Sequence, residues 1–380
     1  MPTTCDHIED QTVEPRLVEV VRSVFHKAFD MRPLDRGLDD RRRSSSQAKT
    51  GRGAGRWRAR VHEKAVDMRA AGLRISCAAL GVVFFGVCPM TAQPVQSTLQ
   101  QRIEAAAKAA LNSPRLRGLT EQQRIARVEF VAGNTLVLLL HELGHVLISE
   151  MRLPVLGREE DAADTYAALR MLMIGTSFSQ HELAQAAQGW FLYDRRDQET
   201  GEKPLYYDEH NLSQQRAYQI LCLMVGSDPE KFKSLADQMK MPESRQLTCK
   251  RDFTKTQQGW EAVLKPWMRE PGDPETRIDV VYGDGKGMYD GVANMFRSIR
   301  FLETVAANSA ARYKWPHPFT LKMESCGHPG TDYEDEARVV TICYETPFDF
   351  AELYRAYVQP PPVARAAPIP KASAQKRKSK

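Results

Sequence analysis

The chain has 380 residues, 42% of them hydrophobic, with 53 lysines and arginines against 48 aspartates and glutamates and a net charge of +5. This composition excludes a wholly disordered chain, and 23 glycines and 22 prolines exclude a collagen-like one. The charge is uneven: residues 1–92 carry +5, residues 93–358 carry −6 and residues 359–380 carry +6. Because the body of the chain is acidic, we expect no nucleic-acid partner.

The first 92 residues are typical of a leader. Residues 1–67 are rich in arginine, serine and glycine, which predicts a disordered basic leader or a start site placed too early. Residues 68–92 combine a basic stretch, an apolar run and small residues, as a secretory signal peptide does. We therefore expect a periplasmic or secreted protein. A single-pass membrane anchor is the alternative if the 75–92 segment stays uncleaved, because it approaches the length of a membrane span.

An apolar segment at 136–148 predicts a buried helix, since hydrophobic residues cover nearly all of its sides. Asn134 or Thr135 is the expected N-cap. The segment contains the motif His-Glu-Leu-Gly-His at 141–145. Histidines four residues apart project from one helical face, and two imidazoles so placed can hold Zn²⁺.

These residues predict a metal centre. We expect His141 and His145 to bind Zn²⁺, and Glu142 to act as the catalytic base that takes a proton from zinc-bound water. Gly144 removes a side chain from the turn, which would let metal or substrate come close. The alternative is a pair of hydrogen-bonded histidines on a core helix, but buried polar groups then need other partners.

The third ligand is expected on the next helix. Residues 154–157 break the chain, and an acidic helix start follows, so the two helices form a hairpin. Glu160 is the expected metal ligand, with Glu159 as its rival. Asp164, one turn after Glu160, is expected to hydrogen-bond a ligand imidazole. Taken alone, this acidic cluster is a favourable helix N-terminus.

His141-Glu142-x-x-His145 followed by Glu160-x-x-Ala-Asp164 resembles the gluzincin pattern of zinc metallopeptidases. The wider sequence, over about residues 95–358, resembles a bacterial "putative metallopeptidase" domain family of unknown function. The resemblance implies zinc and the hydrolysis of peptide bonds.

Gluzincins often carry a histidine or tyrosine that hydrogen-bonds the developing oxyanion. His210 is the catalytic candidate for that role, with Tyr206 or Tyr207 behind it. A surface histidine in a loop before a helix is the alternative. Arg216 could pair with an acidic residue of the site, although a solvated arginine is the more common case.

The remaining elements follow from periodicity and from glycine and proline positions. Helices are expected at 179–193, 213–225, 229–239, 244–264 and 291–311, and strands at 276–282, 319–323 and 338–344. The aromatic residues Trp190, Phe191, Trp260 and Trp267 are interpreted as core anchors rather than as a binding platform.

Four cysteines remain after residue 92, and an oxidising compartment would allow two disulfides. Cys222–Cys249 with Cys326–Cys343 is the local pairing, one of three connectivities, and four free thiols are the alternative. The proline- and alanine-rich tail at 359–380 predicts a disordered basic end.

The fold class expected is mainly α: a zincin-like helical metalloprotease core at 93–268, with a smaller C-terminal α+β part at 269–358 of the same domain. The function expected is a zinc metallopeptidase acting on a peptide or protein substrate. The alternative is an exported zinc-binding structural or interaction protein without turnover.

Overall fold

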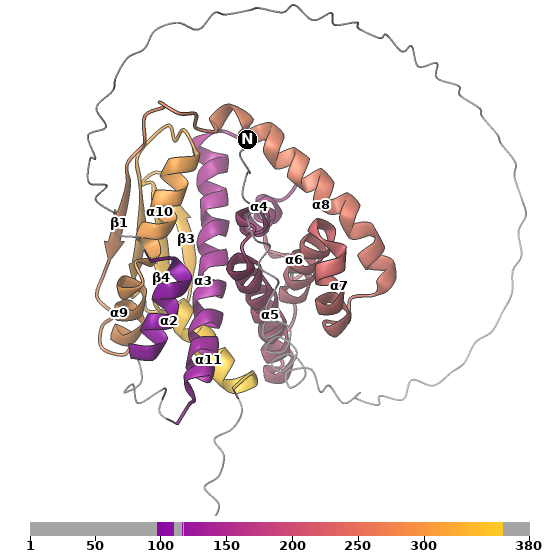
Figure 1. Cartoon of the computed structure of the whole chain (residues 1–380), viewed down its shortest axis with the longest axis vertical. Helices are drawn as coiled ribbons and strands as arrows, with labels where there is room; N and C mark the ends of the chain where they lie inside the picture. Colours follow the sequence, from indigo (N-terminus) through magenta and orange to yellow (C-terminus); the bar gives the residue numbers. More distant parts are fainter. Residues whose placement is uncertain (1–96, 110–115, 117, 360–380) are drawn as a thin grey trace, which may run out of the picture. The chain divides into compact units, whose positions relative to one another are not determined.

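The computed structural model describes residues 97–109, 116 and 118–359. This part is mainly helical, with one small mixed sheet towards the C-terminus, as the sequence predicts (Figure 1). The expected leader, the signal peptide and the basic tail beyond Gln359 lie outside the described residues.

The helices are α2 (Leu99–Ala109), α3 (Glu121–Glu150), α4 (Glu159–Ile174), α5 (Ser177–Thr200), α6 (Ser213–Ser227), α7 (Pro229–Gln238), α8 (Glu243–Leu264), α9 (Asp290–Ser298), α10 (Phe301–Arg312) and α11 (Glu345–Tyr357). A 3-10 turn, η3 (Lys265–Trp267), follows α8. The strands are β1 (Ile278–Tyr282), β2 (Phe319–Glu324), β3 (Thr331–Glu334) and β4 (Val339–Cys343).

Helix α3 begins about four turns earlier than its apolar segment suggests. Thr120 is the N-cap: its side chain accepts a hydrogen bond from the backbone N–H of Gln123, whose side chain in turn accepts one from the N–H of Thr120. This reciprocal capping box satisfies two backbone donors that the first turn of a helix leaves unpaired.

The expected cap at Asn134 or Thr135 is therefore wrong. Both residues are buried inside α3, and their side chains donate to backbone carbonyls one turn earlier, Asn134 to Phe130 at 2.8 Å and Thr135 to Val131 at 2.7 Å. A short polar side chain can satisfy itself in this way within a helix, so it does not by itself mark a helix start.

Helix α3 is the central element of the described fold. It contacts α2, α4, α5 and α11 as well as β3 and β4, and it runs between the sheet and helices α4 to α8 (Figure 1). Its 30 residues are long and apolar enough to cross a membrane, but 89% of its most apolar window is buried inside the protein. We therefore assign α3 as the core helix of the fold.

The sheet has the order β1-β2-β4-β3. β1, β2 and β4 run parallel, with Val280 opposite Leu321 and Leu321 opposite Val340, whereas β3 runs antiparallel to β4. Buried residues alternate along β2, so one face of the sheet is covered. β3 forms the edge of the sheet that contacts α3.

The helix expected at 291–311 is two helices. The chain breaks at Arg300, which adopts a left-handed backbone conformation with φ of 52° between α9 and α10. The break brings Phe296 and Phe301 edge to face, with ring centroids 4.8 Å apart. Since both rings are fully buried, packing of the two aromatic side chains favours the break over a continuous helix.

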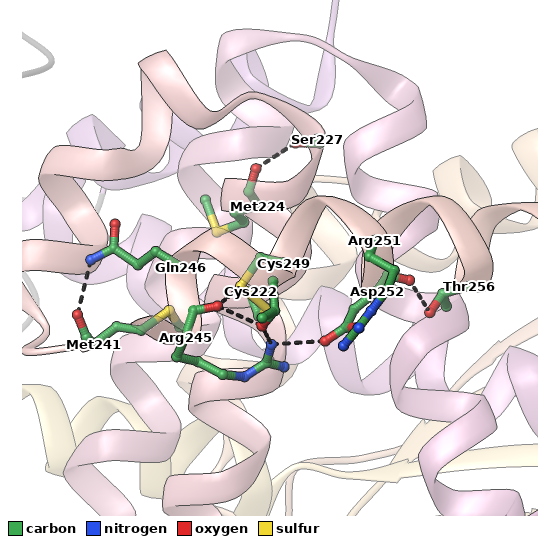
Figure 2. The surroundings of a disulfide bond; sticks show 11 residues. Cys222, Met224, Ser227, Met241, Arg245, Gln246, Cys249, Arg251, Asp252 and Thr256 are labelled. Atoms are coloured by element: carbon green, nitrogen blue, oxygen red, sulfur yellow. Dashed lines mark hydrogen bonds and ion pairs between the residues drawn. A yellow bond between two sulfur atoms is a disulfide. The ribbon is translucent and has the colours of Figure 1, made fainter. Parts of the chain in front are cut away.

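The described residues contain two disulfide bonds, Cys222–Cys249 and Cys326–Cys343, which is the local pairing. Figure 2 shows the first of them joining α6 to α8. The two helices pack closely because Gly226 has no side chain: a Cβ there would lie 2.3 Å from the carbonyl oxygen of Cys249.

Candidate metal centre

The α3–α4 hairpin brings the two halves of the motif together. Gly144 on α3 lies against Ala163 on α4, and a Cβ on Gly144 would be 2.9 Å from the Cα of Ala163. We expected this glycine to admit a metal or substrate; instead it admits the backbone of the second helix. Its position therefore sets how closely α4 approaches the histidines.

The nitrogen and oxygen atoms expected to hold a metal converge between these helices. Nε2 of His141 lies 3.1 Å from Nε2 of His145 and 3.0 Å from Oε2 of Glu160. The same carboxylate oxygen lies 3.5 Å from Nε2 of His145. One carboxylate oxygen and two imidazole nitrogens thus point at a common position.

The other ring nitrogens face carboxylates. Nδ1 of His141 lies 2.8 Å from Oδ1 of Asp164, and Nδ1 of His145 lies 2.8 Å from Oε1 of Glu159. These contacts fix which nitrogen of each ring faces inward. Glu159, the rival third ligand, therefore sits behind His145 rather than among the converging atoms.

Asp164 is itself held by a buried arginine. The guanidinium of Arg216 on α6 donates two hydrogen bonds to the two Asp164 oxygens, at 2.8 and 2.5 Å, and its Cζ lies 3.8 Å above the ring of Trp190. Burial alone would raise the pKa of Asp164, but Arg216 and His141 lower it to about 2. Arg216 is paired and buried, not solvated as is more common for arginine.

His210 approaches the cluster from the loop before α6. Its Nε2 lies 2.9 Å from Oε2 of Glu160, and its ring stacks on that of His141 with centroids 6.0 Å apart. His141, Glu160 and His210 together offer one ligand atom each within 4.8 Å of one another. Tyr206 and Tyr207 are 83% and 86% exposed, so they do not pack behind His210 as expected.

The loop that carries His210 is tied to the start of α4. Asn211 hydrogen-bonds both Arg158 and Asp161, and Arg158 also pairs with Asp161 at 3.2 Å. This polar link holds the loop over the acidic first turn of α4, which fixes where His210 can reach.

Glu142 faces the sheet side of the site. It is buried, and its Oε1 accepts a hydrogen bond of 2.6 Å from the hydroxyl of Thr331, the first residue of the edge strand β3. Sequence reasoning missed Thr331, because nothing in a threonine after a proline-glycine turn distinguishes it from any surface residue.

The loop before Thr331 is firmly anchored. Cys326 in this loop is bridged to Cys343 at the end of β4. Glu345 accepts hydrogen bonds from the hydroxyl of Ser325 and from the backbone N–H of Gly327, at 2.7 and 2.8 Å. The second disulfide therefore supports the strand that contacts Glu142.

The site as a whole attracts positive charge. Burial lowers the pKa of His145, but the neighbouring Glu160 and Glu159 outweigh burial and raise the pKa to about 9. The pKa of His141 is raised in the same way by Asp164 and Glu160, against burial. The carboxylates therefore favour cationic species at the position that the ligand atoms face.

The donor set fits a metal ion. Oε2 of Glu160 is buried and close to three imidazole nitrogens, yet within the described residues it takes part in no hydrogen bond of acceptable geometry. A cation between these atoms would satisfy it. Imidazole nitrogens with one carboxylate oxygen are the ligands of catalytic zinc sites.

The helical region matches one family model. Residues 100–264 match the model of a family described as "Putative metallopeptidase". This stretch is similar to that family. It holds all the candidate site residues except Thr331, namely His141, Glu142, His145, Glu159, Glu160, Asp164, His210 and Arg216. The family resemblance seen in the sequence is confirmed over this stretch, whereas the sheet and the Cys326–Cys343 bridge lie beyond it. No curated protein and no solved structure matches the chain.

Proposed function

We propose that this protein is a zinc-dependent peptidase that hydrolyses peptide bonds with an activated water molecule. The observation that carries the proposal is the convergence of His141 Nε2, His145 Nε2 and Glu160 Oε2 at one position. Three protein ligands with an open fourth position are typical of catalytic zinc. The family match over residues 100–264 supports metallopeptidase activity.

The side chains around the metal position have separable tasks. Bound Zn²⁺ would supply Lewis-acid chemistry, polarising a carbonyl oxygen and lowering the pKa of water towards about 7. Oε1 of Glu142 is already engaged by Thr331, so Oε2 is the atom that we assign to take the proton from water and return it to the leaving amine. His210, half-exposed beside the cluster, would hydrogen-bond the oxyanion.

The edge strand offers a place for an extended peptide. Within the described residues β3 pairs with β4 alone, so the backbone groups on its other edge have no strand partner there, and its first residue touches Glu142. A peptide that added to this edge would gain main-chain hydrogen bonds and pass beside the candidate base. This arrangement supports a peptide or protein substrate.

We also propose that the protein works outside the cytoplasm, in the periplasm or secreted. The two disulfide bonds support this location, because such bonds persist in oxidising compartments.

The test is Glu142→Gln in the full chain. The substituted amide would keep the size of the side chain but could not take a proton, so we expect about one zinc per chain to remain while hydrolysis of a mixed peptide library falls by about 10²–10⁴-fold. Glu121→Gln, at the exposed start of the same helix, is the matched control and should keep full activity. Unchanged hydrolysis in Glu142→Gln would exclude this mechanism. Zinc in the unaltered chain without any hydrolysis would instead indicate a zinc-binding structural protein.

A further inference from the structure

A cavity lies away from the metal centre. It has a volume of about 260 Å³ and is formed by α4, α8, the end of α10 and the residues that follow α8 and α10. Apolar side chains make up most of its wall: Tyr166, Leu169, Met173, Trp260, Leu264 and Met268. None of the candidate metal ligands lines it.

The charged groups at this cavity are mostly cationic. Arg170, Lys265 and Arg312 line it, against one carboxylate, Glu261. Arg170 and Arg312 are partly buried, and in the described part of the chain neither forms an ion pair with a carboxylate. Among the described residues, Arg312 donates to the Tyr313 hydroxyl at 3.2 Å, and its guanidinium carbon lies 5.6 Å from the centre of the Tyr313 ring.

Guanidinium groups that have no carboxylate partner in an apolar wall favour the binding of an anion. Two other arginines of low exposure are paired with carboxylates, Arg216 with Asp164 and Arg196 with Asp349, whereas the buried Arg124 donates to the backbone carbonyl of Leu119. Removing a guanidinium from water without a counter-charge is unfavourable, and a carboxylate is its best-matched partner because it accepts two parallel hydrogen bonds.

The inner wall suits an aromatic or aliphatic body. The rings of Tyr166 and Trp260 lie 5.1 Å apart, and Trp260 is fixed by donating to the Thr165 hydroxyl at 3.2 Å. The hydroxyls of Tyr166 and Tyr313 hydrogen-bond each other at 3.2 Å, so they are satisfied without a ligand. A cavity of about 150 Å³ already accepts benzene, so this one has room for a ring with a short chain.

We propose that this cavity binds a small carboxylate with an apolar body, such as an arylalkanoate, whose carboxylate lies between Arg170 and Arg312. The apolar body fills the space against Trp260 and Leu169. The ligand would contact Leu169 and Arg170 on α4, between one and two turns after Asp164. The proposal stands independently of peptidase activity.

The test is isothermal titration calorimetry of the full chain with 4-phenylbutyrate and with its neutral analogue, 4-phenylbutanol. We expect saturable binding of the acid, and binding of the alcohol at least about tenfold weaker, because the alcohol lacks the charge-assisted hydrogen bonds. Arg170→Gln should weaken the acid about tenfold and leave the alcohol unchanged. Arg251→Gln, the same charge change at an exposed position of α8, should change neither.

The possible results separate this cavity from the metal centre. Acid binding that survives Arg170→Gln would place the carboxylate elsewhere, for example on the metal, and would overturn the proposal. So would equal binding of acid and alcohol, or no saturable binding of either at millimolar concentration. If Arg170→Gln fails to fold, Arg312→Gln gives the same comparison.

Discussion

Asp164 connects a candidate ligand to the rest of the fold. It lies between the Nδ1 atom of His141 and the guanidinium of Arg216, both of which are buried. A carboxylate behind a ligand imidazole orients the ring and raises its basicity, and such partners typically change metal affinity by about 10–100-fold.

We therefore expect Asp164→Asn to weaken zinc binding by about 10–100-fold, because the amide supplies no charge and also leaves Arg216 unpaired. Competition with a chelator of known affinity measures the effect. Glu159→Gln is the matched control: Glu159 plays the same part behind His145, but it is half-exposed and should matter less. A larger effect in Glu159→Gln than in Asp164→Asn would contradict this ranking.

His210 can be distinguished from a ligand by its effect on turnover. A fourth protein ligand would close the site, whereas a catalytic zinc keeps one position open. We expect His210→Ala to retain zinc and to lower kcat by about 10²–10³-fold, as the loss of one oxyanion donor does. Metal analysis together with steady-state kinetics distinguishes an oxyanion donor from a metal ligand. Loss of zinc in His210→Ala would show that His210 is a ligand instead.

The site could be predicted from the sequence only where spacing carried the information. The i,i+4 pair His141 and His145 must share a helical face, and Glu160 follows after a loop short enough for the two helices to lie against each other as a hairpin. The contact of Thr331 with Glu142 bridges 189 positions of the chain, and no local pattern encodes it. The pairing of Arg216 with Asp164 could not be predicted either, because the position of one arginine on a helix does not indicate which carboxylate it binds.

At the scale of elements, the closest approach in the site is that of α3 to α4 at Gly144. We expect Gly144→Ala to lower the free energy of unfolding by about 1–3 kcal/mol, because the new methyl group would lie 2.9 Å from the backbone of Ala163 and the helices would have to part. Thermal unfolding measures this, and zinc affinity should fall with it, since Glu160 moves with α4.

Gly259 provides the control for this change. It also lies inside a helix, α8, but a Cβ there would meet nothing within 4 Å. Gly259→Ala should stabilise the chain by about 0.5–1 kcal/mol through helix propensity alone. If both substitutions shift the unfolding temperature alike, helix propensity rather than close packing governs Gly144.

Helix positions in this chain were easier to predict than their ends. Apolar periodicity located α6 to α8 within a few residues, whereas α5 runs to Thr200, well past its expected end at 193, and α3 begins at the polar capping box of Thr120, outside the apolar run. The break between α9 and α10 depends on packing of Phe296 on Phe301, a tertiary contact. β3 escaped detection because it is four residues long and half exposed, without an apolar pattern.

At the scale of the whole molecule, a buried polar cluster opposes the stability of the helical core. Both carboxyl oxygens of Glu182 on α5 are buried, and they have no hydrogen-bond partner among the described residues. The carboxyl group occupies the space left by Gly133 on α3. Burial raises the pKa of Glu182 well above its usual range. Burial and the charge of Glu104 raise the pKa of the nearby Glu129 to about 7.

These groups make the free energy of unfolding depend on pH. A carboxyl group with a raised pKa in the folded state holds a proton that the unfolded chain releases above pH 4.5, so the free energy of unfolding falls as pH rises through about 7. His181 acts oppositely: burial lowers its pKa to about 4, so stability falls as pH drops below 6.5. Glu129 therefore lowers the stability of the fold between pH 4.5 and about 7, and without bound metal the raised pKa of His145, about 9, continues the loss from pH 6.5 to about 9.

Glu129→Gln should remove the part of that loss that falls between pH 4.5 and about 7. The amide has nearly the same size and never ionises, so the variant should match the unaltered chain in free energy of unfolding near pH 4.5. At pH 9 it should exceed the unaltered chain by up to about 3 kcal/mol, which is the free energy that corresponds to a pKa shift from 4.5 to about 7. Urea unfolding at a series of pH values measures the difference. Glu121→Gln, an exposed carboxylate on the same helix, should give a difference that does not vary with pH in this way. A Glu129→Gln curve parallel to that of the unaltered chain would show that Glu129 ionises normally in the folded protein.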